Sequence, residues 1–156
     1  MQEKPGKQEL IEFKIQIMNG IVPYLNFDGN GSEALQFYCK ALDGKILFQQ
    51  SFGDSPMGDK TPDEFKNRLM HASFQCEAGS FMASDGPPGH KMVNGNNVSL
   101  SLHYDSVAKI EKAFNGLAEG GTVTMPLQET FWAHRFGMLV DKYGFQWMFN
   151  MDKPQQ

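Results

Sequence analysis

The chain has few cysteines, no basic cluster and no long apolar segment. Its 156 residues include two cysteines, Cys39 and Cys76, and neither belongs to a CxxC pair, which excludes a zinc ribbon or CxxC redox motif. Both lie in apolar stretches, where we expect them to pack as small buried side chains. Lys and Arg number 14 against 18 Asp and Glu, and the resulting net charge of −4 argues against binding to nucleic acid.

Sequence signals for membranes, secretion and several common chemistries are also missing. No apolar run approaches the roughly 20 residues of a membrane-spanning helix. The N-terminus lacks the charged start, apolar centre and cleavage site of a secretory signal, so we expect a cytoplasmic protein with no membrane partner. There is no GxGxxG after a strand, no P-loop and no GxSxG nucleophile elbow, which leaves dinucleotide, P-loop and serine-hydrolase sites unsupported.

The first 17 residues stand apart from the rest. Residues 1–7 are mostly polar, and residues 11–17 alternate apolar with polar side chains, which predicts an added edge strand. The alternative is a translated upstream extension, because the main pattern begins at Met18. We therefore treat residues 1–17 as an arm or added strand outside a single domain at 18–152.

That domain contains one order of elements twice. A first module at 18–88 and a second at 97–152 each predict β-α-β-β-β, joined by a linker at 89–96. The strands expected in the first module are 21–27, 45–52, 68–76 and 81–84. Those expected in the second are 98–104, 122–127, 135–140 and 145–150. Asn30 with Glu33, and Asp105 or Ser106, are the candidate helix caps. The fold class is α+β, and the modules share element order but not sequence.

Several local strings follow one another with characteristic spacing. They are PYLNFDGN at 23–30, Ala34 with Phe37-Tyr38, MHA at 70–72, MASD at 82–85, FWAHRFG at 131–137, and then Asp141, Gly144 and Trp147. Over about 18–151 the chain thereby resembles the vicinal oxygen chelate superfamily, which includes glyoxalase I, bleomycin-resistance proteins and extradiol dioxygenases. The strings are most similar to its PhnB-like branch. The resemblance implies tandem modules whose curled mixed sheets surround a cavity, and a homodimer.

The resemblance also implies where a metal would bind. Metal-using members place four ligands, usually His or Glu, on the first and last strands of each half. Transferred by strand order, these positions are Val22, Ala83, Ser99 and Met148. None is a good ligand for zinc, nickel or iron. A slipped frame would bring in Tyr24, Ser101, Asp85 or Asn150, of which only Asp85 suits a metal. We expect no cofactor, and a divalent metal is the alternative.

Strand alternation extends the face of these positions. On the first strand it adds Tyr24, and on the fifth it adds Ser101 and His103. Such a polar stripe faces either solvent or, in this fold, a wet cavity that binds a ligand.

Two residues are candidates for acid–base chemistry. His71 lies in an apolar strand, where an imidazole acts as acid, base or ligand near neutral pH, or is a core histidine bonded to a backbone carbonyl. Asp85 ends the fourth strand, where it serves proton transfer or turn formation.

The string at 131–137 offers an anion-binding group. The planar guanidinium of Arg135 suits a carboxylate or phosphonate, and Trp132 can stack on or cover a ligand. The alternative is structural: Arg135 pairs with Asp141 or another carboxylate, and Trp132 fills a dimer contact.

Two functions follow, and the sequence does not decide whether the protein is an enzyme. The first is metal-independent binding of a small polar or anionic molecule through Tyr24, Ser101, His103, Trp132 and Arg135. The second is a lyase, isomerase or dioxygenase related to glyoxalase I, which uses a divalent metal or His71 and Asp85 for proton transfer. A purely structural or interaction role is the third alternative.

PhnB-like proteins often carry the description of a demethylubiquinone methyltransferase. No glycine-rich loop that would hold S-adenosylmethionine follows a strand in this sequence. The sequence therefore gives that description no support.

Overall fold

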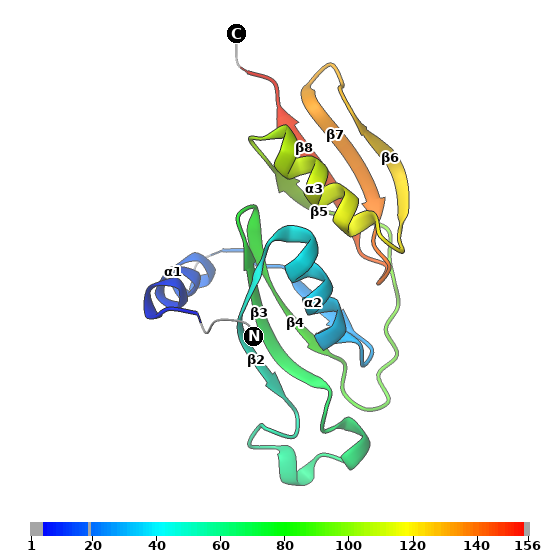
Figure 1. Cartoon of the computed structure of the whole chain (residues 1–156). Coiled ribbons are helices and arrows are strands. Elements are labelled where there is room, and N and C mark those ends of the chain that lie inside the picture. The colour runs from blue at the N-terminus through cyan, green and yellow to red at the C-terminus, as the bar shows by residue number, and fades with distance from the viewer. Residues whose placement is uncertain (1–4, 19, 155–156) are drawn as a thin grey trace. The chain divides into compact units, whose positions relative to one another are not determined.

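The computed structural model describes residues 5–18 and 20–154 (Figure 1). The contacts divide the chain into two units, one reaching to residue 92 and one starting at residue 93, with residues 40–43 grouped with the second. Each unit contains a four-stranded mixed sheet. The α+β class predicted from the sequence is confirmed.

The first unit contains two α-helices, two 3₁₀ turns and one sheet. Its elements are α1 (Lys7–Met18), β1 (Tyr24–Phe27), α2 (Gly31–Leu42), β2 (Lys45–Ser51), the 3₁₀ turns η1 (Gly58–Lys60) and η2 (Asp63–Phe65), β3 (Leu69–Cys76) and β4 (Gly79–Asp85). The strand order is β1-β4-β3-β2. β1 runs parallel to β4, and the other pairs are antiparallel.

The second unit repeats this arrangement. Its elements are β5 (Leu100–His103), α3 (Val107–Ala118), β6 (Thr122–Gln128), β7 (Ala133–Val140) and β8 (Gln146–Asp152). The strand order is β5-β8-β7-β6, again with one parallel pair, β5 with β8.

Each sheet buries one face beneath its helix. In the first unit Tyr38 of α2 is fully buried and meets the ring of Phe81 edge-on, with centroids 5.6 Å apart. In the second, Phe114 of α3 meets Phe149 edge-on at 5.2 Å, and Trp147 is also buried. Because strand side chains alternate, every second residue then points to the face opposite the helix.

The sheet edges are short or interrupted. The edge strands β1 and β5 have four residues each. The other edges, β2 and β6, carry register shifts, and β6 contains Pro126, which has no N–H to donate.

The strand predicted at 11–17 is wrong, because these residues belong to the helix α1. The backbone N–H of Gly6 donates to Glu9 Oε2 at 2.9 Å, and Gln8 Nε2 donates to Glu12 Oε1 at 3.1 Å. These bonds join residues three and four apart, which are close together on one side of a helix but are roughly 10 Å or more apart along a strand. None of the helices in residues 5–18 and 20–154 combines the length and apolar character needed to span a lipid bilayer.

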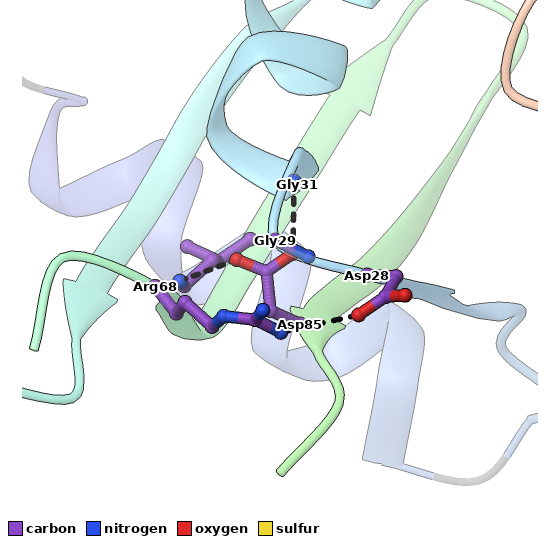
Figure 2. A network of polar contacts seen from close by, with 6 residues as sticks. Asp28, Gly29, Gly31, Arg68 and Asp85 are labelled. Carbon is purple, nitrogen blue, oxygen red and sulfur yellow. Dashed lines mark hydrogen bonds and ion pairs between the residues drawn. The ribbon is translucent and has the colours of Figure 1, made fainter. Parts of the chain in front are cut away.

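A buried carboxylate connects three segments of the first unit (Figure 2). Asp85 Oδ1 accepts hydrogen bonds from the backbone N–H groups of Gly29 and Gly31, both at 2.9 Å. Its Oδ2 accepts from the N–H of Leu69 at 2.7 Å. Asp85 is 3% exposed, so it caps the N-terminus of α2 from a strand more than 50 residues further along the chain.

Asp141 plays a similar part in the second unit. Its Oδ1 accepts from the N–H groups of Tyr143 and Phe145 at 2.8 and 3.0 Å, and its Oδ2 accepts from the indole N–H of Trp147 at 2.8 Å. The turn between β7 and β8 is thereby bonded to the core.

Replacing Asp85 by Ala leaves the amides of Gly29, Gly31 and Leu69 without their acceptor. Because an unpaired buried donor costs about 1–3 kcal/mol, we expect the free energy of unfolding to fall by about 3 kcal/mol or more. Urea denaturation followed by circular dichroism measures this change. Asp59→Ala, at an exposed position on η1, is the matched control and should stay within about 0.5 kcal/mol. Equal losses in both variants would contradict the role of Asp85.

Candidate functional site

The face of the first sheet opposite α2 carries polar and aromatic side chains. The strand register places Tyr24, Met82, Ser73 and Phe48 in one row across β1, β4, β3 and β2. His71 is two residues before Ser73 and shares this face. The chain thus brings together residues whose strands are distant in sequence.

Tyr24 and His71 form a hydrogen-bonded pair on this face. The Tyr24 hydroxyl lies 2.9 Å from His71 Nδ1, and the two ring centroids are 5.7 Å apart. The Phe48 ring lies on the other strand neighbouring β3, with its centroid 6.0 Å from that of His71. Tyr24 is 41% exposed and Phe48 46%, so the pair is within reach of a ligand.

Burial lowers the pKa of His71 below its ordinary value of 6.5. The imidazole is therefore neutral at pH 7, with one nitrogen carrying a proton and one free to accept. When the Tyr24 hydroxyl donates to Nδ1, the proton of His71 resides on Nε2. His71 then presents its Nε2–H as a donor to a ligand. In the other tautomer, Nε2 has no proton and can act as a base.

Asp85, the other candidate for proton transfer, has a different environment. Both of its oxygens accept hydrogen bonds from backbone amides, and it lies on the helix side of the sheet. The structure therefore does not bring Asp85 together with His71 on the face opposite α2.

The four strand positions expected to carry metal ligands do not share one face of a sheet. Ala83 is fully buried on the face toward α2, whereas its neighbour Met82 is opposite Tyr24 on the other face. Val22 and Ser99 precede β1 and β5, and Met148 pairs with Ser101. The transferred frame was wrong by one residue on β4, because the sequence alone does not fix which face of that strand meets the helix.

These side chains do not fit a tightly bound divalent ion. Within residues 5–18 and 20–154 there is no group of three or more His, Cys, Asp or Glu side chains suited to hold a metal. The strand positions opposite Tyr24 and Ser101 carry thioethers, Met82 and Met148, which are poor ligands for zinc, magnesium or manganese.

The face of the second sheet opposite α3 carries the polar stripe expected on β5. Ser101 and His103 are exposed, while Leu102 between them is buried. Ser101 Oγ lies 3.2 Å from His103 Nε2, and Asn150 Nδ2 lies 3.5 Å from His103 Nδ1. The sequence had no means of identifying Asn150 as the neighbour of His103, because that pairing depends on the register of β5 with β8.

A pocket of about 510 Å³ opens where β5 and β8 end. It is lined by His103, Tyr104, Asp105, His134, Asn150, Met151, Asp152, Lys153 and Pro154. Of these residues the sequence proposed only His103 for ligand binding, and it named Asn150 for a slipped metal frame and Asp105 as a helix cap. The lining residues on β7, on β8 and after β8 are brought there by strand pairing, which the local pattern does not specify.

Arg135 and Trp132 occupy separate surroundings at the start of β7. Arg135 Nη1 donates to the backbone carbonyl of His134 at 2.8 Å. Trp132 is 47% exposed and meets the ring of Phe136 edge-on at 5.4 Å. Phe136 pairs with Asn150 on β8, so Trp132 lies beside the face that carries His103.

A family model described as 3-demethylubiquinone-9 3-methyltransferase matches residues 19–149. The chain belongs to this family. The curated relative protein YjdN of Escherichia coli K12 is 35% identical over 144 residues, which cover 85% of this chain and 95% of YjdN. Among solved structures, protein PA1353 from Pseudomonas aeruginosa is 43% identical, with a TM-score of 0.76, and the match covers 86% of this chain and 98% of PA1353.

A further solved relative is the PhnB protein from Bacillus cereus, a match that supports the PhnB-like branch expected from the sequence. It is 27% identical, with a TM-score of 0.71, and covers 85% of this chain and 99% of that protein. A glyoxalase/bleomycin resistance protein/dioxygenase domain from Frankia is 17% identical, with a TM-score of 0.61 and coverage of 86% and 98%. The vicinal oxygen chelate fold is thereby confirmed.

The lowered pKa of His71 predicts a pH-dependent stability. Because the folded state binds this proton less tightly than the unfolded state, the free energy of unfolding should fall as the pH drops below about 6.5, and level off below the folded pKa. His71→Gln should remove this component of the pH dependence, and His90→Gln in the exposed linker should retain it. Urea denaturation between pH 5 and 8 measures both, and a ring NMR titration of His71 with a pKa above 6.5 would contradict the argument.

Proposed function

We propose that the protein binds a small polar or anionic molecule at a polar cluster on the face of one sheet, without a tightly bound metal ion. The observation that carries this proposal is the Tyr24–His71 pair, hydrogen-bonded at 2.9 Å on a sheet face that is part-exposed. A polar pair of this kind contributes nothing to the helix-side core. It suits the recognition of a ligand oxygen.

The pair supplies a directed donor. With the Tyr24 hydroxyl bonded to Nδ1, the Nε2–H of His71 is free to donate to a carboxylate, phosphate or carbonyl oxygen. The ring of Phe48 and the thioether of Met82 flank it and exclude water from one side of the ligand. The lowered pKa of His71 keeps this donor uncharged at neutral pH.

The second sheet, taken by itself, carries groups of the same character. Ser101 and His103 form a polar pair on β5, and Trp132 presents an exposed indole that can stack on a ligand. The guanidinium of Arg135 adds positive charge from the other face of the sheet, because Arg135 precedes Phe136 in β7. We assign these four residues to binding. We also expect a homodimer, as the family resemblance implies, and a cytoplasmic location.

The description of the family raises the alternative of methyl transfer, which needs a methyl donor such as S-adenosylmethionine. The loop between β1 and α2 is where such a donor would meet backbone amides at a helix N-terminus. Its amides at Gly29 and Gly31 already donate to Asp85, and a Cβ at Gly31 would lie 2.9 Å from Asp85 Oδ1. This loop is occupied by the protein itself and does not fit the donor.

One observation favours a second candidate, a lyase, isomerase or dioxygenase related to glyoxalase I. A neutral imidazole at pH 7 is a competent base, and the lowered pKa of His71 gives it that state. The proton transfer would then be the work of His71, with the Tyr24 hydroxyl holding the ring in place. Asp85 is left out of this role because its oxygens are bonded to backbone amides.

The binding proposal is tested by thermal shift with acetate, inorganic phosphate and methylphosphonate, on protein purified without chelator or metal-affinity steps. We expect at least one anion to raise the melting temperature, and Tyr24→Phe and His71→Gln each to weaken its apparent affinity about tenfold, through loss of a hydrogen bond. Tyr143→Phe, in the turn of the second unit, is the matched control. No response to any anion, or an equal loss in the control, would contradict the proposal.

Metal content is measured on the same preparation by elemental analysis. Below 0.1 transition-metal equivalents per chain (on the order of background) is the expected result, because thioethers at the strand positions bind zinc-like ions poorly. A stoichiometric divalent ion whose removal lowers the melting temperature would overturn the metal-independent reading and favour the enzyme.

A further inference from the structure

Four polar side chains form a chain of hydrogen bonds across β5 and β8. Asn150 Nδ2 donates to Asp152 Oδ1 at 2.7 Å and lies 3.5 Å from His103 Nδ1. His103 Nε2 in turn lies 3.2 Å from Ser101 Oγ. His103 and Asn150 are register partners, and Ser101, two residues before His103, and Asp152, two residues after Asn150, share their face.

The carboxylate of Asp152 determines which group donates and which accepts in each of these hydrogen bonds. An ionised carboxylate only accepts hydrogen bonds, so the Asn150 atom that faces it is the amide nitrogen. The same amide nitrogen then faces His103 Nδ1, which must accept. Neutral His103 therefore carries its proton on Nε2 and donates it to Ser101 Oγ.

This direction leaves the Ser101 hydroxyl proton free. Because Ser101 Oγ accepts from His103, its own O–H points away from the imidazole and is available to another acceptor. Ser101 is exposed and is not part of the pocket lining, but it contacts His103, which lines the pocket together with Asn150 and Asp152. The order is opposite to that of a catalytic serine, whose hydroxyl donates to the imidazole.

The remaining wall of the pocket also favours an acceptor ligand. His134 contributes an imidazole, which has at least one N–H in any protonation state. Lys153 has an ammonium group with three donors, of which Glu129 takes one at 3.0 Å. The carboxylates on the wall have partners of their own, since Asp105 lies 3.7 Å from Lys109 and Asp152 accepts from Asn150.

We propose that a carboxylate binds at this pocket, in which His134 of the wall and Ser101, next to the wall residue His103, donate to the ligand and Lys153 balances its charge. Asn150 and Asp152 are positioning residues that hold His103 in the Nε2–H tautomer. The inference rests on the proposed binding function and places a carboxylate-bearing ligand in the second unit. It assigns roles to His134, Asn150 and Asp152 that the sequence did not suggest.

The tautomer is tested without any ligand. Long-range ¹H–¹⁵N correlation spectra of the intact chain distinguish the two tautomers of His103, and we expect the Nε2–H form at pH 8. The double variant Asn150→Asp with Asp152→Asn keeps the composition and charge but exchanges the donor and acceptor roles in these hydrogen bonds. His103 should therefore change to the Nδ1–H form. An Nδ1–H tautomer in the native protein, or no change in the double variant, overturns the positioning role.

Ligand binding is tested with acetate, with acetamide as the uncharged control. Acetate should shift the ring signals of His134, and Ser101→Ala should weaken its affinity about tenfold. The double variant should weaken acetate by a similar factor, because the Ser101 proton would then be donated to His103. Acetate binding unaffected by Ser101→Ala, or acetamide bound equally well, overturns the carboxylate site.

The two proposals fail separately. If Tyr24→Phe loses the thermal response to anions while acetate still shifts the His134 ring signals, the result bears only on the site of the first sheet. An unperturbed His134 alongside a Tyr24-dependent anion response overturns the second-unit pocket and leaves the general binding function intact.

Discussion

The buried carboxylate of Asp85 fixes the geometry on which the first unit depends. Burying an ionised group is costly unless it is fully hydrogen-bonded, and here three backbone amides supply the bonds. Those amides belong to the turn after β1, the start of α2 and the start of β3. These bonds determine which side chains of β1 face the helix: Leu25 and Phe27 lie under α2, and Tyr24 lies on the opposite face.

Much of the fold was predictable because its signals are local. Alternating strands, glycine turns and helical spacing gave the order of both modules, and the structure has that order. The N-terminal helix was missed, because seven alternating residues fit a strand as well as a helix. The bonds that favour α1 come from Gly6 and Gln8, which precede the alternating stretch.

The site was less predictable because it depends on register. Tyr24 and His71 are 47 residues apart, and no local pattern indicates that their side chains meet at 2.9 Å. The same holds for His103 and Asn150, which are neighbours only through the parallel pairing of β5 with β8. Asp85 was read as a turn or proton-transfer residue, since its amide partners lie on other elements. Sequence reasoning found the residue types, and strand pairing determined their neighbours.

Membership of the family establishes the fold more firmly than the chemistry. The same architecture supports unrelated functions, so the reaction must be argued from side chains in each member. In this chain the amides at the N-terminus of α2, where a nucleotide-like cofactor would bind, donate to the carboxylate of Asp85. The family description names a methyltransferase, whereas the loop before α2 in this chain leaves no amides for a methyl donor.

The interrupted edges of both sheets constrain how copies of the chain can associate. A long, regular edge strand offers a row of free N–H and C=O groups that recruits further strands. Here β1 and β5 end after four residues, register shifts interrupt β2 and β6, and Pro126 removes a donor from β6. Growth of either sheet by backbone pairing is therefore disfavoured. We therefore expect copies of the chain to associate through side-chain contacts rather than by pairing of strand edges. Such contacts depend on sequence, so they select particular partners.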